Sequence, residues 1–355
     1  QGDDTSEEST QTWLRSGPWE KRVREECEAV RDQVAILDLP GFSRFRIRGN
    51  GCSGWLGSQI TGVLPKIGRL SLAYFLDQRG RVVTEMSIMR EDEEDFILIT
   101  AANAQWHDIE LLKSRLPSKK SISIEDLSTT YSTLIITGPK SREVLSKFSS
   151  ADLDLPWLSL QKTNFEIHDV NFARVSFAGE LGWEIHAKNS DIKQIYDTLT
   201  SFGVKPFGMF ALNSLRIEKG YKTWKGDLST DYSALESGLD RFVRLDKFND
   251  FPGKSSVLIE KQKGVSKKAV ILVLEKHDCD APYMSTIWKD GKIVGEVTSG
   301  AWGYRVGASI ALAMLKTEFA VFGEKVEIDI YGQKVKATVK GNKPLWDPNN
   351  ERIRA

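Results

Sequence analysis

The sequence predicts an α+β protein that carries a second, β-rich domain at its C-terminal end. With 355 residues the chain is too long for one ordinary hydrophobic core. Up to about residue 250, short strand patterns alternate with helix patterns, whereas beyond about residue 266 strands joined by tight turns take over. We therefore expect an α+β body over residues 19–255 and a β-barrel-like domain over residues 266–355. The polar, acidic residues 1–18 are expected to form an arm or a linker.

In the body, the spacing of apolar residues separates strands, with a period near two, from helices, with a period near 3.6. Strands are expected at 70–76, 82–90, 96–100, 131–136 and 172–177, and helices at 19–33, 103–115, 139–148, 190–202 and 208–220. At the start of the third of these helices, Gly138 and Pro139 are expected to form a turn. The amphipathic segment after that turn carries Val144, Leu145 and Phe148 on one face.

The C-terminal domain is predicted from three stretches with strand character, "AVILVLEKHD", "STIWKDGKIVGEVTS" and "KVEIDIYGQKVKATV". The second stretch contains Asp290-Gly291 and the third contains Tyr331-Gly332, and such pairs are typical of tight hairpin turns. These segments are therefore expected to pair as antiparallel hairpins.

Charge and cysteine usage exclude several classes of protein. Forty-nine basic residues balance 49 acidic ones, so nothing in the net charge favours a nucleic acid or an acidic membrane as partner. No apolar run approaches 18 residues and no export signal opens the sequence, so no membrane association is expected. Three scattered cysteines suggest a reducing compartment, either the cytoplasm or, in a eukaryote, the mitochondrial matrix. Four histidines without ligand-like spacing argue against a zinc site.

A glycine-rich motif raises the possibility of dinucleotide binding. Gly49, Gly51 and Gly54 spell G-x-G-x-x-G after a plausible strand. A Rossmann first strand is buried on both faces, but here apolar residues and arginines alternate from Arg44 onward, which predicts a half-exposed strand. Pro65 then leaves room for about two helical turns, too few for a dinucleotide fold. We interpret the motif as a structural turn, and expect that the chain does not retain FAD.

Seven motifs, taken in order, resemble the aminomethyltransferase (T-protein) family of the glycine cleavage system. They are "RGRVVTEMSI" (79–88), "TLIITGPKSREVL" (133–145), "GELGWEI" (179–185), "ALNSLRIEKGY" (211–221), "ALESGLDRFVRLDK" (234–247), "DFPGK" (250–254) and "TSGAWGYRVGASIALA" (298–313). The details are most similar to the folate-binding C-terminal part of dimethylglycine and sarcosine dehydrogenases, in which a flavin domain precedes this part. The resemblance implies an aminomethyltransferase-like fold and tetrahydrofolate as cofactor.

The resemblance also implies residues that bind the cofactor. Glu184 stands where the family has its pterin-binding glutamate, and a carboxylate can accept two adjacent N–H groups of a pterin ring. Glu180, in the same motif, is expected to shape the turn beside the cofactor. Phe177 and Trp224 are similar to aromatic positions near the cofactor, where flat rings pack well. The alternatives are an exposed strand glutamate for Glu184 and core positions for the two aromatic residues.

Glu85 in "VVTEMSI" aligns with the family's catalytic aspartate. A carboxylate there can stabilise positive charge on the one-carbon unit or relay a proton. The glutamate side chain is one methylene longer than aspartate, which changes how far its carboxylate reaches. The alternative is that Glu85 is an exposed glutamate on a strand.

Leu212 and Leu72 replace a folate-contacting arginine and a tyrosine of the family. Arg216 is expected to be a structural ion-pair partner.

These observations predict transfer of a one-carbon unit from an N-methylamine-derived iminium or formaldehyde to tetrahydrofolate, giving 5,10-methylenetetrahydrofolate. The expected partners are the small methylated amine and a separate flavoprotein oxidase. Two alternatives stay open. The first is a stand-alone methyltransferase or demethylase for a methylated osmolyte, and the second is a non-catalytic, folate-binding regulatory subunit.

Overall fold

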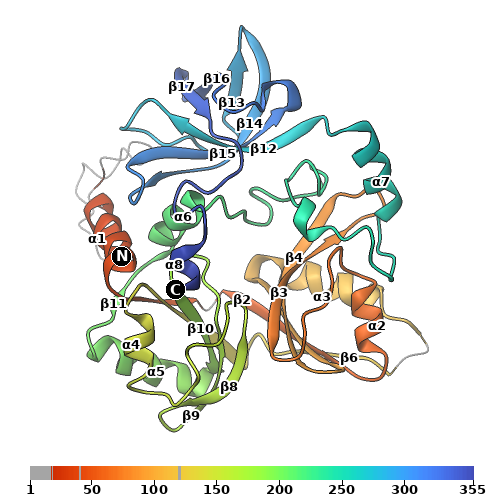
Figure 1. The fold of residues 1–355 in the computed structure, drawn as a ribbon, viewed down its shortest axis with the longest axis vertical. Coiled ribbons are helices and arrows are strands. Elements are labelled where there is room, and N and C mark those ends of the chain that lie inside the picture. Colours follow the sequence, from red (N-terminus) through yellow and green to blue (C-terminus); the bar gives the residue numbers. More distant parts are fainter. Residues whose placement is uncertain (1–16, 18, 40, 119–120) are drawn as a thin grey trace.

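The computed structural model describes residues 17, 19–39, 41–118 and 121–355, so nearly all of the arm expected over residues 1–18 lies outside the described residues. The described chain forms three lobes (Figure 1), one around each of two sheets and one formed by a closed barrel. In that part of the chain, no helix combines the length and the apolar character needed to cross a membrane. The three cysteines form no disulfide with one another and are buried, one in each of three separate hydrophobic clusters.

The first lobe is built on a five-stranded antiparallel sheet in the order β3-β4-β5-β2-β6. Its elements are β2 (Phe42–Arg48), α2 (Cys52–Gly57), β3 (Arg69–Leu76), β4 (Val82–Asp92), β5 (Asp95–Ala101), η2 (Ala102–Ala104), α3 (Gln105–Ser114) and β6 (Ser123–Asp126). Apolar side chains of one sheet face pack against α2 and α3, with Phe45, Phe75 and Phe96 fully buried. Because successive strand residues point to opposite faces, Tyr74 and Glu85 lie on the other face.

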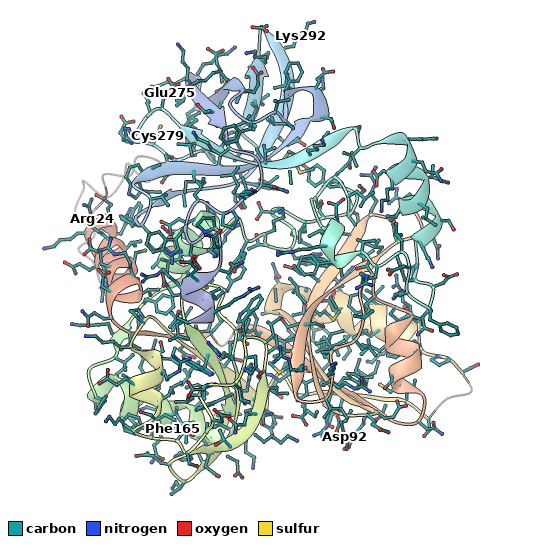
Figure 2. The ribbon with its side chains drawn as sticks, in the orientation of Figure 1. Arg24, Asp92, Phe165, Glu275, Cys279 and Lys292 are labelled. Carbon is teal, nitrogen blue, oxygen red and sulfur yellow. The ribbon has the colours of Figure 1, made fainter. Side chains whose placement is uncertain are left out.

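The second lobe is built on a six-stranded sheet in the order β11-β1-β7-β10-β9-β8, in which only β1 and β11 pair in parallel. Its strands are β1 (Ala35–Leu39), β7 (Tyr131–Thr137), β8 (Leu160–Phe165), β9 (His168–Ala173), β10 (Gly182–Lys188) and β11 (Lys205–Pro206). One face packs against α4 (Ser141–Leu145) and α5 (Asn189–Ser201) around the buried Phe165, labelled in Figure 2. The other face is covered by α1 (Trp19–Asp32) and α6 (Met209–Glu218).

The third lobe is a closed six-stranded barrel, as the sequence predicts for the C-terminal region. Its strands, in the order β12-β15-β14-β13-β16-β17, are β12 (Lys267–Leu274), β13 (Thr286–Lys289), β14 (Lys292–Gly303), β15 (Ala308–Lys316), β16 (Lys325–Ile330) and β17 (Gln333–Val339), with η4 (Thr317–Phe319) after β15. Asp290 and Tyr331 have φ of 49° and 51°, and a glycine with positive φ follows each. Two consecutive left-handed residues are what a two-residue hairpin requires.

Residues 219–253 form a long connection between α6 and α7 (Lys254–Lys263) and include η3 (Asp240–Phe242). We call this segment the α6–α7 connection. Its apolar side chains, among them Leu228, Leu239 and Phe251, pack against Tyr74, Leu76 and Val82 of the five-stranded sheet. The same connection touches the barrel through a hydrogen bond between Asp227 and Thr298. It therefore joins the sheet face that carries Glu85 to the third lobe.

Two elements end earlier than the sequence predicts. The strand expected at 172–177 is β9, which begins at His168 and ends at Ala173, since the chain turns there: the N–H of Val175 bonds to the carbonyl oxygen of Ala173. The helix expected at 139–148 is α4 and ends at Leu145. The Ser146 hydroxyl donates to the carbonyl oxygen of Glu143 at 2.7 Å, a local bond by which serine competes with helix continuation.

The glycine-rich motif lies in a structural turn, as we expected. Strand β2 before it pairs antiparallel with β5 and β6, and the helix after it has six residues, so a dinucleotide-binding βαβ unit is absent from this place. A Cβ atom on Gly49 would collide with the carbonyl oxygen of Ser121, so close packing of the backbone explains why a glycine stands at this position. The prediction of a half-exposed strand is wrong for Arg44, which is 2% exposed because β2 faces the second lobe at this point.

Candidate functional site

Glu85 lies on the face of the five-stranded sheet that the α6–α7 connection covers. In β4 it pairs with Tyr74 of β3, and Leu72 pairs with Ser87 two residues further along. Directly opposed residues of antiparallel strands point to the same face, so Tyr74, Glu85 and Leu72 share one face. Glu85 is half-buried, while Leu72 exposes 38% of its surface although it is apolar. The carboxyl group of Glu85 therefore lies beside an apolar, partly open patch.

The environment of Glu85 favours its protonated form. Burial raises the pKa of this carboxyl group to about 8, and the nearby carboxylate of Asp227 adds to the effect. Lys222, the backbone N–H of Trp224 and Arg216 oppose it. A carboxyl group with a pKa near neutrality can both hold and release a proton under ordinary conditions, which is the property expected of a general acid or base.

Trp224 lies in the α6–α7 connection, directly against β4. Its indole N–H donates to the carbonyl oxygen of Val83 at 2.8 Å, and its ring lies 5.4 Å from the ring of His107 in α3. Lys225 places its ammonium group 4.9 Å from the centre of the indole. These contacts fix the ring next to Glu85 and leave it half-buried.

An ion pair between Arg216 and Asp227 anchors the connection, as we expected for Arg216. The Nη1 atom of Arg216 lies 2.8 Å from Oδ2 of Asp227, and both residues are almost fully buried. The same oxygen accepts from the backbone N–H and the hydroxyl of Thr223, and Oδ1 accepts from Thr298 at 2.6 Å. Asp227 is thus satisfied by protein groups on both oxygens.

Glu184 lies on β10 in the second lobe, opposite Ile135 of β7. The two side chains therefore share one face of the sheet, the face on which Ile135 packs with Leu212 and Phe177. The Glu184 side chain is 13% exposed, and its Oε2 lies 3.3 Å from Nε2 of His186. One carboxylate oxygen is thus close to the buried imidazole of His186, while the group keeps some access to solvent.

Arg44 extends this cluster from the first lobe, and the sequence analysis did not find it as a site residue. Its Nη2 donates to the Thr133 hydroxyl and lies 3.0 Å from Nδ1 of His186. Its Nε and Nη1 atoms are buried without a hydrogen-bond partner among the described residues. Burial lowers the pKa of Arg44 to about 10, an effect that the negative charge of Glu184 opposes. Burial together with the charge of Arg44 lowers the pKa of His186, although its contact with Glu184 acts in the opposite direction.

Phe177 lies between the residues around Glu184 and the α6–α7 connection that covers Glu85. Its ring stacks on that of Tyr221 at a centroid distance of 5.7 Å and an interplanar angle of 20°. Tyr221 directly precedes Lys222, whose charge acts on Glu85. Leu212 is buried in the hydrophobic cluster against which Phe177 packs. The structure therefore links the Glu184 face to the Glu85 face through an aromatic pair.

Glu180 is bound within the protein on both oxygens. Its Oε1 accepts from Arg305 at 2.9 Å and from the indole N–H of Trp346 at 2.7 Å, and its Oε2 accepts from Arg352 at 2.6 Å. Arg352 belongs to α8 (Glu351–Arg354), the last helix of the chain. The residue is 1% exposed and fastens the C-terminal segment to the turn between β9 and β10.

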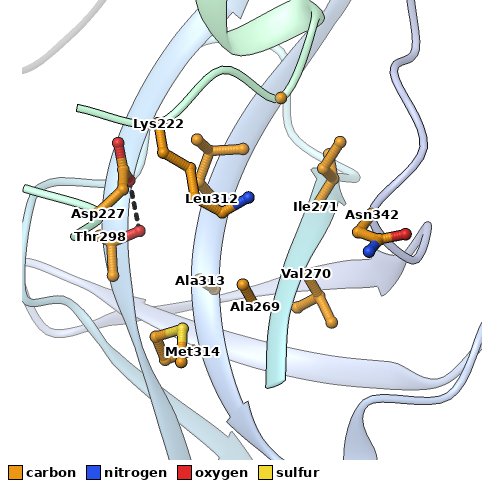
Figure 3. Close-up of a pocket in the computed structure, with 11 residues that line it drawn as sticks. Lys222, Asp227, Ala269, Val270, Ile271, Thr298, Leu312, Ala313, Met314 and Asn342 are labelled. Atoms are coloured by element: carbon orange, nitrogen blue, oxygen red, sulfur yellow. Dashed lines mark hydrogen bonds between the residues drawn. The ribbon is translucent and has the colours of Figure 1, made fainter. Parts of the chain in front are cut away.

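The pocket in Figure 3 lies between the α6–α7 connection and the barrel. Lys222 and Asp227 line one side of it, and Val270, Ile271 and Leu312 of the barrel line another. Its volume of about 10 Å³ suits a single water molecule at most, so a cofactor of folate size does not fit there. Across the described part of the chain, no group of three or more histidine, cysteine or acidic residues is arranged to hold a metal ion.

Two protein families match this chain, "GCVT N-terminal domain" over residues 6–247 and "Glycine cleavage T-protein C-terminal barrel domain" over residues 267–347. The first match covers more than half of the chain. The chain therefore belongs to the GCVT family of folate-dependent, aminomethyltransferase-like proteins.

Known relatives agree with this assignment. Mitochondrial dimethylglycine dehydrogenase of Mus musculus is 32% identical over 321 residues, which are 88% of this chain and 37% of the relative. The mitochondrial pyruvate dehydrogenase phosphatase regulatory subunit of Mus musculus is 27% identical over 309 residues, 83% of this chain and 35% of the relative. The chain thus spans little more than a third of the length of these two proteins.

A solved structure supports the fold alone. The crystal structure of the glycine cleavage system aminomethyltransferase T from Bartonella henselae matches with a TM-score of 0.84 and 22% identity, covering 90% of this chain and 88% of that one. The aminomethyltransferase-like fold with a C-terminal barrel, expected from the sequence motifs, is confirmed.

Proposed function

We propose that this chain binds tetrahydrofolate and transfers to it a one-carbon unit derived from an N-methylamine. The observation that carries the proposal is Glu85: a member of a folate-dependent family places a half-buried carboxyl group, with a pKa of about 8, between aromatic side chains. Residues 19–255 would bind the folate, and residues 266–355 would close the site from the barrel side.

The residues present suit a pterin. Glu184 has one oxygen near His186 and some access to solvent, so its carboxylate can accept two N–H groups side by side. Phe177, braced by Tyr221, offers an aromatic surface on the same sheet face, and Trp224 offers a second one beside Glu85. Glu180 would support the folate site indirectly, because its two carboxylate oxygens already accept hydrogen bonds from Arg305 and Arg352. When bound, tetrahydrofolate would supply the nitrogen atoms that take up the one-carbon unit.

Glu85 would handle charge and protons at the reacting centre. An iminium carbon carries positive charge, and an ionised Glu85 would stabilise it across a half-buried, low-dielectric gap. A protonated Glu85 would release its proton as such charge arrives, because a nearby cation lowers a carboxyl pKa. The backbone N–H of Trp224 favours the ionised form of Glu85 and would help to keep the carboxyl group oriented.

The donor would reach this site from a separate flavoprotein oxidase, since oxidation of an N-methylamine to an iminium needs an electron acceptor. A chain that spans about a third of its dehydrogenase relative leaves room for such a partner, as a subunit or as part of a longer protein. The cytoplasm, or the mitochondrial matrix in a eukaryote, would be the compartment.

A second candidate is a folate-binding regulatory subunit. It is favoured by Leu212, which offers no charge where the family has an arginine, and by a relative whose name describes a regulatory subunit. Folate binding is common to both candidates, whereas turnover belongs to the first alone.

The experiment is one-carbon transfer from formaldehyde to tetrahydrofolate, measured as the rate above the uncatalysed condensation. We expect a clear enzymatic rate that falls by about 10²–10⁴-fold in Glu85→Gln, with folate affinity changed much less. Glu85→Asp restores the family's residue but shortens the side chain, so it should also lower the rate. A folded wild-type chain that binds folate yet adds nothing to the background rate would favour the regulatory candidate.

A further inference from the structure

His186 lies two residues after Glu184 on strand β10, so the two side chains point to the same face of the six-stranded sheet. On the neighbouring strand β7, Ile135 is opposite Glu184 and Thr133 is opposite His186. Only 4% of the His186 side chain is exposed, against 13% for Glu184. The imidazole thus belongs to the buried surroundings of a carboxylate that itself keeps contact with solvent.

Two side chains contact the Nδ1 atom of His186, and both can donate a hydrogen bond to it. The Nη2 atom of Arg44 lies 3.0 Å from Nδ1, and a guanidinium can donate but cannot accept. The hydroxyl oxygen of Thr133 also lies 3.0 Å from Nδ1. This oxygen accepts from the same Nη2 atom, so the hydroxyl hydrogen is free to point at the ring. Nδ1 is therefore the acceptor and carries no proton.

The other ring nitrogen of His186 faces the carboxylate. In a neutral imidazole one nitrogen accepts and the other carries the proton, so the proton is on Nε2. Oε2 of Glu184 lies 3.3 Å from Nε2. Nε2 is buried and makes no hydrogen bond of good geometry among the described residues, which leaves this carboxylate oxygen as an acceptor within reach. A small turn of the carboxylate would complete the bond, and such bonds commonly tighten when a ligand binds.

Arg44 opposes a second proton on His186. That proton would have to sit on Nδ1, directly against the cationic guanidinium, and burial of the ring lowers the pKa of His186 in the same direction. Nε and Nη1 of Arg44 make no hydrogen bond among the described residues, so Nη2 makes the side-chain hydrogen bonds that reach the second lobe. A side chain of the first lobe thus sets which nitrogen of His186 carries the proton.

We propose that Arg44 and His186 are positioning residues for the Glu184 carboxylate: Arg44 fixes the tautomer of His186, and the Nε2–H group of His186 holds Oε2 of Glu184. The inference rests on the proposed function, because Glu184 is the carboxylate that would bind the pterin. A carboxylate that accepts from His186 with one lone pair keeps others for two adjacent N–H groups of a pterin. Fixing its plane before the ligand arrives reduces the ordering that binding requires.

The tautomer is tested first, without any ligand. NMR spectroscopy of the ring nitrogens distinguishes a protonated nitrogen from a bare one, and His186→Asn identifies the signals of His186 among the four histidines. At neutral pH we expect a neutral ring with its proton on Nε2. In Arg44→Met, Nδ1 loses the guanidinium donor, so forms with a proton on Nδ1 should appear. A wild-type ring with a proton on Nδ1, or an unchanged ring in folded Arg44→Met, would overturn the inference and leave the proposed function standing.

The effect on binding is tested by calorimetric titration of His186→Gln and His186→Asn with tetrahydrofolate, after circular dichroism has established that each variant is folded. The amide nitrogen of glutamine can reach the position of Nε2, whereas that of asparagine reaches only the position of Nδ1. We expect His186→Gln to bind within about twofold of wild type and His186→Asn to bind roughly three- to tenfold more weakly, the size of one ordinary hydrogen bond. In a Glu184→Gln background, His186→Asn should cost nothing further, because the two residues act as one unit.

The matched control is His168→Asn. His168 lies on the neighbouring strand β9, with its Nδ1 3.8 Å from Asp191 of α5, the helix that covers the opposite face of the sheet, and this variant should bind as wild type does. Equal affinities of His186→Gln and His186→Asn, whether both match wild type or both are weakened, would overturn the positioning role. An additive loss in the double variant would do the same. A wild type that binds no tetrahydrofolate would overturn the proposed function and the positioning role with it.

Discussion

At the scale of single residues, Glu184 makes the most direct prediction about ligand recognition. In Glu184→Gln one carboxylate oxygen becomes an N–H donor, which would face a donor of the pterin ring. Loss of a charged hydrogen bond should weaken tetrahydrofolate binding by about 1.5–3 kcal/mol, measured by calorimetry. Glu125→Gln, at an exposed position of β6, is the control and should bind as wild type does. Equal affinities for wild type and Glu184→Gln would remove this residue from the site.

Glu85 makes a prediction about stability and pH. Its pKa is about 8 in the folded chain and near 4.3 in an unfolded one, so the folded state binds the proton more tightly. The protonated Glu85 carboxyl group makes its full contribution to the free energy of unfolding below pH 4. This contribution is lost as the pH rises toward 8, by at most about 1.4 kcal/mol per pH unit.

Glu85→Gln has no such proton to lose. The free energy of unfolding of Glu85→Gln, taken relative to that of the wild type, should therefore be higher at pH 8 than at pH 5 by a few kcal/mol, on the order of 1–4. Denaturant unfolding of both proteins at the two pH values measures the difference. A difference that stays constant with pH would mean that the carboxyl group is hydrated and ordinary.

Sequence reasoning found only part of the candidate site at this scale. Glu85 and Glu184 are candidates because they lie in motifs that resemble those of the family, and Phe177 and Trp224 are candidates because they are similar to aromatic positions of the family. Arg44 is not among them, because its alternating pattern indicates an exposed side chain, and its partners His186 and Thr133 lie about 90 to 140 residues further on. Unpaired cations have no sequence signal, since pairing depends on which acids the fold brings near.

At the scale of elements, the turn between β9 and β10 is fastened to the C-terminal helix by Glu180. Arg305 and Glu180 are each about 1% exposed, and removing one partner of a buried charge network leaves the other uncompensated. Glu180→Gln should therefore lower the free energy of unfolding by about 3–5 kcal/mol. Denaturant unfolding gives this value.

The matched control is Glu143→Gln, at an exposed position of α4, which should stay within about 0.5 kcal/mol of wild type. If Glu180→Gln were as stable as that control, the network would not hold the C-terminal segment.

Elements with strong local signals could be predicted closely. Helix α1 and strands β3, β5 and β7 lie within about one residue of expectation, and the Asp-Gly and Tyr-Gly turns form the hairpins they indicate. Helix α4 and strand β9 end early, since a serine bond and a chain reversal decide their ends. Such ends depend on hydrogen bonds that periodicity does not encode.

At the scale of the whole molecule, the candidate site residues belong to no single lobe. The five-stranded sheet carries Glu85, the six-stranded sheet carries Glu184, and the α6–α7 connection carries Trp224. Figure 1 shows the two sheets in separate lobes. The division into an α+β region and a barrel could be predicted from the change of pattern near residue 266. That the first region forms two lobes could not, because both consist of the same short strands and helices, and only long-range pairing separates them.

The central claim, that the chain binds tetrahydrofolate, is tested most directly by calorimetric titration of the folded protein with tetrahydrofolate. We predict a saturable heat with one equivalent bound per chain, and a negative heat-capacity change, because aromatic and apolar surface at Phe177, Trp224 and Leu72 would be buried. The same titration with an unrelated pteridine-free carboxylic acid should give no saturable signal. A folded chain without saturable heat from tetrahydrofolate would contradict the account.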